Sequence, residues 1–262
     1  MRRPAAGLVV WLVAVCAAVT GCGGDAPRPR PVWAPAPGTA WQWQLTTPVD
    51  LSVDVPVYDI DGFANSAGTV AALHRRGRHV ICYVDVGSAE RFRPDYRAFP
   101  ASVIGKPNGW PGERWLDVRR IDVLGPIMAR RFDMCAAKGF DAVEPDLVDG
   151  YENPTGFPIT AADQLRYNRH IAALAHRRHL SVALKSDHRQ APALVRDFDF
   201  ALSEECVRYG ECRYLRPFAR AGKAVLEVEY TLPRSRFCPV ARAEGLSAMR
   251  KHRGLGAWRA PC

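Results

Sequence analysis

Short apolar runs rich in β-branched and aromatic residues alternate along the chain with longer amphipathic segments. Runs of this length and composition are typical of buried strands. In the longer segments apolar residues recur at helical spacing, and Thr160 precedes one of them as a candidate N-cap. The predicted strands are 41–45, 55–60, 79–86, 142–146, 181–186, 198–203, 224–230 and a weaker 256–258, and the predicted helices are 67–76, 122–138, 161–178, 214–221 and 241–253.

Eight strands that alternate with helices predict a parallel sheet. The alternating region, 41–262, is long enough for a closed (β/α)8 (TIM) barrel in one α/β domain, which is the predicted fold. An open, doubly wound sheet is the alternative. Because no Gly-x-Gly-x-x-Gly segment follows the first predicted strand, the sequence lacks the fingerprint of a dinucleotide-binding fold.

The N-terminal segment has the pattern of an export signal. Arg2 and Arg3 precede an apolar run over 8–19 that is too short to span a bilayer comfortably. The run leads into Val-Thr-Gly-Cys, which resembles a bacterial lipobox. We therefore predict a lipoprotein signal peptide over 1–21 and lipidation of Cys22, with an ordinary cleavable signal as the alternative.

Five prolines between positions 27 and 37 predict an extended tether over 22–40. The domain 41–262 would then be held at the membrane through the N-terminal lipid. The expected location is the cell envelope, outside the cytoplasm.

The net charge is +9 at pH 7, but the basic residues are scattered, without a run of four or more. A basic protein without such a cluster is not expected to bind nucleic acid. The composition, with 48% hydrophobic and 24% charged residues, is that of an ordinary globular domain, and we expect a monomer.

Six of the eight cysteines remain once Cys16, in the signal, and Cys22 are set aside. An even number fits disulfides in an exported protein. The sequence contains no Cys-x-x-Cys and no paired histidines, so a zinc site is not predicted. The favoured pairs are Cys206–Cys212 and Cys238–Cys262, while Cys82 and Cys135 either pair or stay buried as thiols.

Acidic residues gather at the C-terminal ends of the predicted strands, where the active site of a barrel lies. Like charges held together out of water raise one another's pKa, which keeps one carboxylate protonated while another is ionised. This arrangement suits general acid/base catalysis. A metal site is less favoured because an ordered ligand pattern is missing, and we predict no metal and no cofactor. The candidate residues are Asp59, Asp61, Tyr83, Asp85, Asp146, Asp149, Tyr151, Lys185, Glu204 and Glu229.

Because successive side chains of a strand alternate between its two faces, residues two apart point the same way and differ in depth along the barrel. Glu144 and Asp146 are two residues apart and point to the same face. Glu144 is expected one layer deeper, where it can pair with Lys185, and Asp146 at the rim. Glu204 is expected at the rim of the sixth strand.

The segment 139–151, Gly-Phe-Asp-Ala-Val-Glu-Pro-Asp-Leu-Val-Asp-Gly-Tyr, resembles the characteristic segment of glycoside-hydrolase family 114, the endo-α-1,4-polygalactosaminidase-like proteins. The resemblance implies a (β/α)8 barrel that hydrolyses polysaccharide containing α-1,4-linked galactosamine. Further pieces of the pattern follow in order, at 41–45 (Trp-Gln-Trp-Gln-Leu), 58–61 (Tyr-Asp-Ile-Asp), 82–87 (Cys-Tyr-Val-Asp-Val-Gly), 184–185 (Leu-Lys) and 204–206 (Glu-Glu-Cys).

By this resemblance Asp146 is the nucleophile and Glu204 the general acid/base of a retaining, two-carboxylate mechanism. The pattern has Ser at position 85 and Asn at 147 and 186, where this chain has Asp85, Leu147 and Ser186, so the sugar-binding subsite is expected to be altered. The residues expected to bind the polysaccharide are Asp59, Asp61, Tyr83, Asp85, Asp149, Tyr151, Lys185 and Glu229.

A second interpretation belongs to another class of protein. A surface lipoprotein could bind glycan on the same barrel without cleaving it, because a fold alone does not establish activity. The departures at 85, 147 and 186 favour this alternative, whereas the retained Asp146 and Glu204 favour the enzyme.

Overall fold

The structure is a computed structural model that describes Met1 and residues 32–262. Apart from Met1, the predicted signal peptide 1–21, the lipidation site Cys22 and the tether up to residue 31 lie outside the described residues. Residues 32–262 form a compact unit. It includes the last nine positions assigned to the tether, where the Trp33 ring stacks on His79 at 4.1 Å. Within the described residues, no helix is long and apolar enough to cross a membrane.

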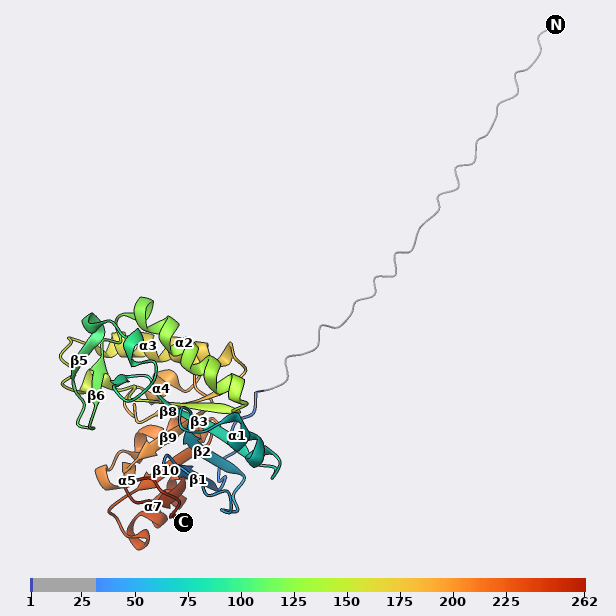
Figure 1. The fold of residues 1–262 in the computed structure, drawn as a ribbon. Coiled ribbons are helices and arrows are strands. Elements are labelled where there is room, and N and C mark those ends of the chain that lie inside the picture. The colour runs from blue at the N-terminus through green and yellow to red at the C-terminus, as the bar shows by residue number, and fades with distance from the viewer. Residues whose placement is uncertain (2–31) are drawn as a thin grey trace. The chain divides into compact units, whose positions relative to one another are not determined.

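Eight parallel strands follow one another in chain order around a curled sheet, as the predicted (β/α)8 barrel requires (Figure 1). A short ninth strand pairs antiparallel with the last of them. The predicted fold class is confirmed. The strands are β1 (Trp41–Gln44), β2 (Val57–Asp61), β3 (His79–Asp85), β7 (Ala142–Asp146), β8 (Ser181–Lys185), β9 (Phe200–Glu204), β10 (Val225–Glu229), β11 (Ser247–Arg250) and the antiparallel β12 (Ala260–Pro261).

Hydrogen bonds outside the strand ladders join the first strand to the segment around the last. The Trp41 indole donates to Ser247 O at 2.8 Å, and Leu45 N donates to Leu255 O at 3.0 Å. The buried Lys251 ammonium donates to the Gln42 side chain at 3.1 Å. These contacts bring β1 and β11 together and enclose the interior of the barrel.

Helices cover the outer face of the sheet, and α2 and α3 lie side by side above β3 and β8 (Figure 1). Thr160 caps α3 through a capping box with Asp163, as its position predicts. Helix α2 ends at Gly139, whose φ of 87° suits a residue without a side chain. The helices are α1 (Ala67–His74), α2 (Ile121–Lys138), α3 (Ala161–His176), α4 (Ala191–Leu194), α5 (Cys206–Tyr209), α6 (Arg216–Arg220) and α7 (Arg234–Glu244), with 3₁₀ turns η1 (Tyr96–Ala98), η2 (Ala101–Val103), η3 (Gly150–Glu152) and η4 (Cys212–Leu215).

The last strand differs from its prediction. The run 256–258 is not a strand, and the eighth barrel strand is β11, within a segment predicted to be helical. Helix α7 stops at Glu244 because Gly245 takes a left-handed conformation with φ of 72°. With only Ala248 and Met249 buried, β11 has too short an apolar pattern to stand out in the sequence.

A small antiparallel sheet lies between β3 and α2 and was not predicted. Its strands pair in the order β4-β6-β5. The connection between β5 and β6 is a hairpin that extends from the upper left of the barrel in Figure 1. The strands are β4 (Ser88–Glu90), β5 (Ile104–Pro107) and β6 (Glu113–Leu116).

Side chains of the strands alternate between two apolar clusters. On β3, Ile81 belongs to the cluster that fills the barrel, and Cys82 and Val84 belong to the larger cluster between sheet and helices. Trp41 and Trp43 are the largest members of the inner cluster. The inner cluster fills the barrel interior below the C-terminal ends of the strands. The polar side chains at these ends therefore lie directly above packed apolar residues.

Three disulfides fasten the outer layer. Both favoured pairs, Cys206–Cys212 and Cys238–Cys262, are confirmed. The open question about the remaining two cysteines is answered by a bond between Cys82 on β3 and Cys135 on α2.

Candidate active site

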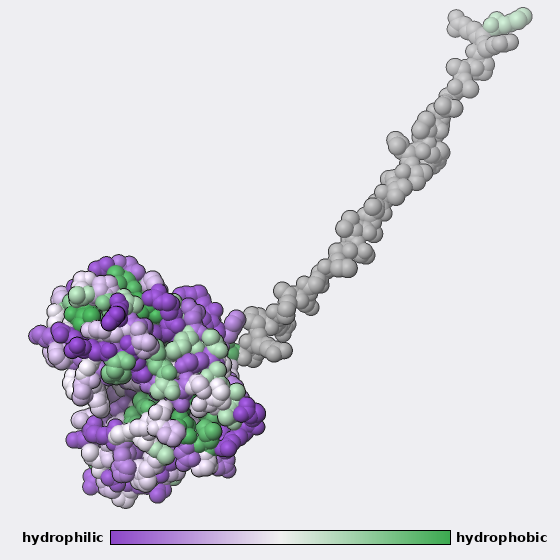
Figure 2. All heavy atoms as spheres, viewed as in Figure 1, coloured by the Kyte–Doolittle hydropathy of each residue, from purple (hydrophilic) through white to green (hydrophobic). Residues whose placement is uncertain are grey.

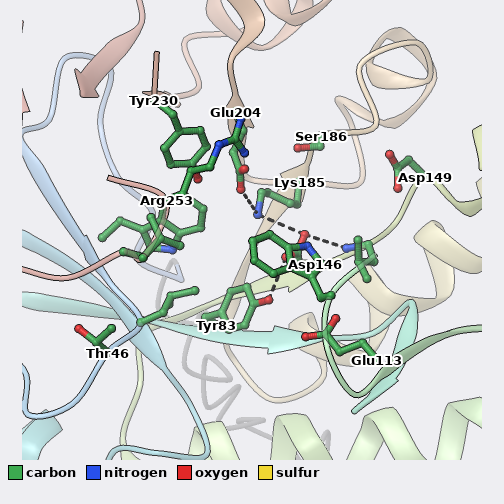
Figure 3. A pocket seen from close by; sticks show the side chains of 16 residues that line it. Thr46, Tyr83, Glu113, Asp146, Asp149, Lys185, Ser186, Glu204, Tyr230 and Arg253 are labelled. Carbon is green, nitrogen blue, oxygen red and sulfur yellow. Dashed lines mark hydrogen bonds and ion pairs between the residues drawn. The ribbon is translucent and has the colours of Figure 1, made fainter. Parts of the chain in front are cut away.

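A pocket of about 420 Å³ opens at the C-terminal ends of the barrel strands. Figure 3 shows its walls, and the surface view has a recess on the side where the β5–β6 hairpin faces α5 (Figure 2). The pocket is lined by Trp43, Leu45, Thr46, Tyr83, Trp110, Glu113, Asp146, Leu147, Asp149, Lys185, Ser186, Glu204, Tyr230, Arg253, Gly254 and Leu255.

A buried lysine connects the two carboxylates that the sequence singled out. Lys185 Nζ lies 3.1 Å from Asp146 Oδ1 and 3.2 Å from Glu204 Oε1 (Figure 3). It also donates to Glu144 Oε1 at 2.8 Å, which confirms the predicted pair of Glu144 and Lys185 one layer deeper. The ammonium thus contacts three acids and fixes the two at the rim relative to each other.

Asp146 receives two more hydrogen bonds. The Tyr83 hydroxyl donates to Oδ2 at 2.9 Å, and the backbone nitrogen of Leu147 donates to Oδ1 at 2.8 Å. Burial and the charge of Asp146 raise the pKa of Tyr83 well above its usual value, so the phenol keeps its proton and remains a donor. These bonds orient the Asp146 carboxylate at the end of β7.

Glu204 occupies a more open position at the end of β9. Its side chain is 33% exposed, compared with 19% for Asp146. Burial and the nearby Glu204 carboxylate raise the pKa of Tyr230, which stays protonated beside it. Glu204 is therefore placed to exchange protons with a molecule in the pocket.

A carboxyl pair lies beneath the lysine. Asp59 on β2 is completely buried, and Glu144 is its acidic neighbour. Two ionised carboxylates cannot hydrogen-bond to each other, because neither has a proton to donate. Burial and the charge of Glu144 raise the pKa of Asp59 well above its usual value, which favours a protonated Asp59 that can donate to Glu144. Glu144 in turn holds Lys185.

Half of the ten predicted site residues line the pocket, namely Tyr83, Asp146, Asp149, Lys185 and Glu204. Burial and the charge of Asp146 raise the pKa of Asp149 to about 6. The other five do not line the pocket, although each was predicted to bind substrate: Asp59, Asp61, Asp85, Tyr151 and Glu229.

Asp61 and Asp85 are engaged by neighbouring protein groups. Arg93 binds Asp61 through two nitrogens, at 3.0 and 2.6 Å. Asp85 is 1% exposed and accepts from the backbone nitrogens of Gly87 and Ser88, at 3.0 and 2.8 Å. Both acids shape the turns that follow their strands instead of facing the pocket.

Glu229 and Tyr151 also have protein partners. Glu229 points out of the barrel and accepts from the backbone nitrogens of Val207 and Arg208, at 2.9 and 3.1 Å, at the start of α5. Tyr151 donates to Asp187 Oδ1 at 3.2 Å from the turn η3. These contacts stabilise the loops around the site.

The residues that follow β7 and β8 share an unusual backbone conformation. Leu147 and Ser186 have φ of 59° and 52°, and both line the pocket. Asn adopts this left-handed conformation more readily than most residues, which fits the asparagines that the family pattern places at both positions. The bend after β7 directs the Leu147 nitrogen back to Asp146.

Among the pocket residues that were not predicted are three with charged or large aromatic side chains that lie outside the predicted strand ends. Trp110 and Glu113 come from the unpredicted β5–β6 hairpin, and Arg253 follows the misplaced last strand. Arg253 pairs with Glu205 at 3.0 Å. For Glu113 the only signal in the sequence is an acid three residues after a tryptophan, which does not predict where the side chain lies.

In the described part of the chain, the carboxylates of Asp85, Glu90 and Glu113 lie close enough together to hold a metal ion. Each of the three acids has a hydrogen-bond donor within the protein. Arg93 binds Glu90 at 2.7 Å, the Ser88 hydroxyl donates to Asp85, and the Asn108 amide donates to Glu113 at 2.9 Å. These contacts explain why three acids can be held together by protein groups alone.

A (β/α)8 barrel with two carboxylates around a lysine at the ends of its strands belongs to the class of barrel glycoside hydrolases. The sequence pattern of glycoside-hydrolase family GH114 matches residues 24–262. The chain therefore belongs to this family, and the resemblance inferred from the sequence is confirmed.

Similar proteins agree with this assignment. The crystal structure of Aspergillus fumigatus Ega3 in complex with galactosamine superposes with a TM-score of 0.84 at 37% identity, covering 88% of this chain and 97% of that one. The glycoside hydrolase domain of PelA from Pseudomonas aeruginosa shares the fold, with a TM-score of 0.65 at 12% identity over 86% of this chain and 98% of that domain. An uncharacterised protein of Deinococcus radiodurans is 29% identical over 71% of this chain, which spans 66% of that protein's length.

Proposed function

We propose that this protein is an exported glycoside hydrolase that cleaves polysaccharide containing α-1,4-linked galactosamine. The observation that carries the proposal is the pair Asp146 and Glu204, held by one lysine in a pocket at the mouth of a GH114 barrel. The similarity to Ega3, whose crystal structure contains galactosamine, supports an amino sugar as the unit that enters the pocket.

The distance between the carboxylates favours a retaining mechanism. Lys185 Nζ is 3.1 Å from Asp146 Oδ1 and 3.2 Å from Glu204 Oε1, so these oxygens are at most about 6.3 Å apart, below the roughly 6.5–9.5 Å of inverting glycosidases. Retaining enzymes place the two groups about 5–5.5 Å apart. A separation of that size leaves no room for a water molecule between the carboxylate and the sugar, so in the proposed mechanism Asp146 attacks directly.

The reaction takes two displacement steps. In the first, protonated Glu204 gives its proton to the glycosidic oxygen while an Asp146 oxygen bonds to the anomeric carbon, and the C–O bond to the leaving sugar breaks. In the second, the Glu204 carboxylate takes a proton from water, whose oxygen displaces Asp146 from the anomeric carbon. The product keeps the original anomeric configuration, and both carboxyl groups return to their starting states.

Lys185 serves both steps from one position. Before the first step its charge balances Asp146, and after Asp146 becomes an ester it balances the newly ionised Glu204. A buried ammonium within 3.2 Å of both groups can do this without moving. The lysine is therefore a positioning and charge-balancing residue, not a ligand of the leaving group.

The activity is tested by measuring reducing ends released from partly deacetylated α-1,4-galactosaminogalactan. Wild-type protein should cleave it, and Asp146→Asn and Glu204→Gln should each lower kcat by at least about a thousandfold. Asp133→Asn, on the exposed face of α2 beside Arg178, is the matched control and should act like wild type. NMR of the first product formed should show the α anomer. Binding of the polymer without cleavage by any variant would instead support the non-catalytic, glycan-binding lipoprotein.

We also propose that Cys22 is lipidated and anchors the domain at the cell envelope. The apolar run 8–19 and the Val-Thr-Gly-Cys sequence support this proposal. Incorporation of radiolabelled palmitate by the wild type, and its loss in Cys22→Ser, would be the expected result. Release of an unlabelled wild-type protein into the medium would contradict it.

A further inference from the structure

The tip of the β5–β6 hairpin presents a tryptophan to the pocket. Trp110 is 57% exposed and yet belongs to the pocket wall. An exposed ring alone needs no ligand, but this one lies in the pocket wall, where it offers a large, rigid face to a molecule in the pocket. The proposed two-step reaction at Asp146 and Glu204 gives it no role.

The hairpin holds this ring in a defined place. Gly109 and Gly112 flank it with φ of 102° and 86°, conformations that suit glycine. The Asn108 side chain accepts from Trp110 N at 3.0 Å and donates to Glu113 Oε2 at 2.9 Å. One asparagine thus fixes the backbone of the tryptophan and the carboxylate of Glu113 together.

Glu113 provides a carboxylate on the same wall. Its hydrogen-bond partners within residues 32–262 are the Asn108 amide and the Ser88 hydroxyl, and both are neutral. Figure 3 shows Glu113 and Asp149 on one side of Asp146, and Tyr230 and Arg253 on the other.

The opposite wall has the opposite character. The Arg253 guanidinium lies 4.8 Å from the centre of the Tyr230 ring and 3.0 Å from Glu205. Because Arg253 is already paired with Glu205, that wall offers a cationic sugar unit no carboxylate in place of Glu113, whose hydrogen-bond partners are neutral.

We propose that Trp110 and Glu113 form a subsite for a second galactosamine unit, next to the unit that is cleaved. The C–H face of the sugar stacks on the indole, and its ammonium group donates to the Glu113 carboxylate in a charge-assisted hydrogen bond. This inference rests on the proposed function, because it takes its ligand from the same polymer. It assigns substrate recognition to the hairpin and not to the barrel strands.

The test separates binding from cleavage. Binding of α-1,4-linked galactosamine oligomers is measured by calorimetry in the Asp146→Asn background, with and without Trp110→Ala or Glu113→Gln. We expect Trp110→Ala to weaken binding about three- to tenfold, from the usual contribution of an aromatic contact. Glu113→Gln should weaken binding of the deacetylated oligomer about tenfold or more and leave the N-acetylated oligomer unchanged.

Two controls isolate the subsite. Trp258→Ala removes a 45% exposed ring that stacks on His252 outside the pocket lining, and should leave binding unchanged. Galactosamine monosaccharide, which fills one subsite, should bind all variants alike. An equal loss for monosaccharide and oligomer would overturn the proposal, because the hairpin would then only support the catalytic pocket.

The remaining outcomes are also decisive. Unchanged oligomer binding in both variants overturns the subsite, and no binding of oligomers to any protein overturns both the subsite and the proposed function. Oligomer binding that depends on the hairpin, without cleavage by the wild type, refutes the hydrolase and keeps the subsite.

Discussion

Replacing Asp59 with asparagine should raise the stability of the protein at neutral pH, although Asp59 is completely buried beneath the active site. Burial and the charge of Glu144 raise its pKa well above the usual value, so the folded state keeps a proton that the unfolded chain releases. An asparagine amide can donate to Glu144 as the protonated acid does, and its volume is nearly the same. The variant therefore keeps the support of Lys185 without the need for a proton.

The sign and size of the effect follow from linkage. Above the unfolded pKa of Asp, about 3.9, the folded state binds the extra proton, and Asp59 lowers the unfolding free energy of the wild type by about 1.4 kcal/mol per pH unit. This stability is fully present below that pKa and is lost as the pH rises towards the folded pKa, which lies well above the usual value. Asparagine does not titrate, so the advantage of Asp59→Asn grows with the same slope from about pH 4 upwards.

Urea denaturation of both proteins between pH 4.5 and 7.5 measures this difference directly. Asp54→Asn is the control, since its side chain is fully exposed and its substitution should leave the pH dependence unchanged. Stability curves separated by a constant amount at every pH would show that Asp59 does not hold a proton in the folded state. A difference that changes with pH but leaves Asp59→Asn less stable than wild type at pH 7.5 would show that the amide cannot replace the acid, and either result would refute the reasoning.

Three further substitutions test other parts of the structure. Lys185→Met should lower kcat/KM by about a thousandfold in the reducing-end assay, because both rim carboxylates lose their shared cation; wild-type kinetics would contradict this role. Gly87→Ala should lower the unfolding free energy by about 3 kcal/mol or more, because a Cβ would lie 1.7 Å from Leu147 O; an unchanged urea midpoint would exclude this close approach. Removing the Cys82–Cys135 disulfide with serines should cost about 4 kcal/mol, as expected for a bond across 53 residues; equal stability of the serine variant under oxidising conditions would contradict it.

The barrel and its deepest ion pair could be predicted from the sequence because both depend on local periodicity. The first seven predicted strands begin and end within two residues of those observed. The two-residue period also placed Glu144 below Asp146 and beside Lys185, and the distance of 2.8 Å confirms it. Packing of a parallel barrel leaves little freedom once the strands and their inward faces are known.

The same period could have excluded Glu229 from the pocket. Leu226 and Val228 belong to the inner cluster, so the two acids that alternate with them, Glu227 and Glu229, must point outwards. Their outward position at the end of β10 places them against the start of α5, where Glu227 accepts from Cys206 N at 3.0 Å. A position at a strand end therefore does not place a side chain in the pocket unless the side chain also points inwards.

The hairpin residues could not be placed by periodicity. Strand β6 pairs with its hairpin neighbour β5 in an irregular register, and with β4, which comes before β5 in the chain. The side of the barrel on which Trp110 and Glu113 lie depends on this non-local pairing. The short β11 was missed for a related reason, because its position is fixed by pairing with β10 and not by a strong apolar pattern.

The different surroundings of Asp146 and Glu204 argue for their roles without reference to the family. A nucleophile must be aimed and must stay ionised, whereas a general acid/base must gain and lose protons in contact with the substrate and water. Asp146 is held by Lys185, Tyr83 and the Leu147 nitrogen, while Glu204 is the more exposed group and meets Lys185 through a single oxygen. With the roles exchanged, the proton carrier would be the residue already bound by three donors. The geometry therefore favours Asp146 as the nucleophile and Glu204 as the acid/base.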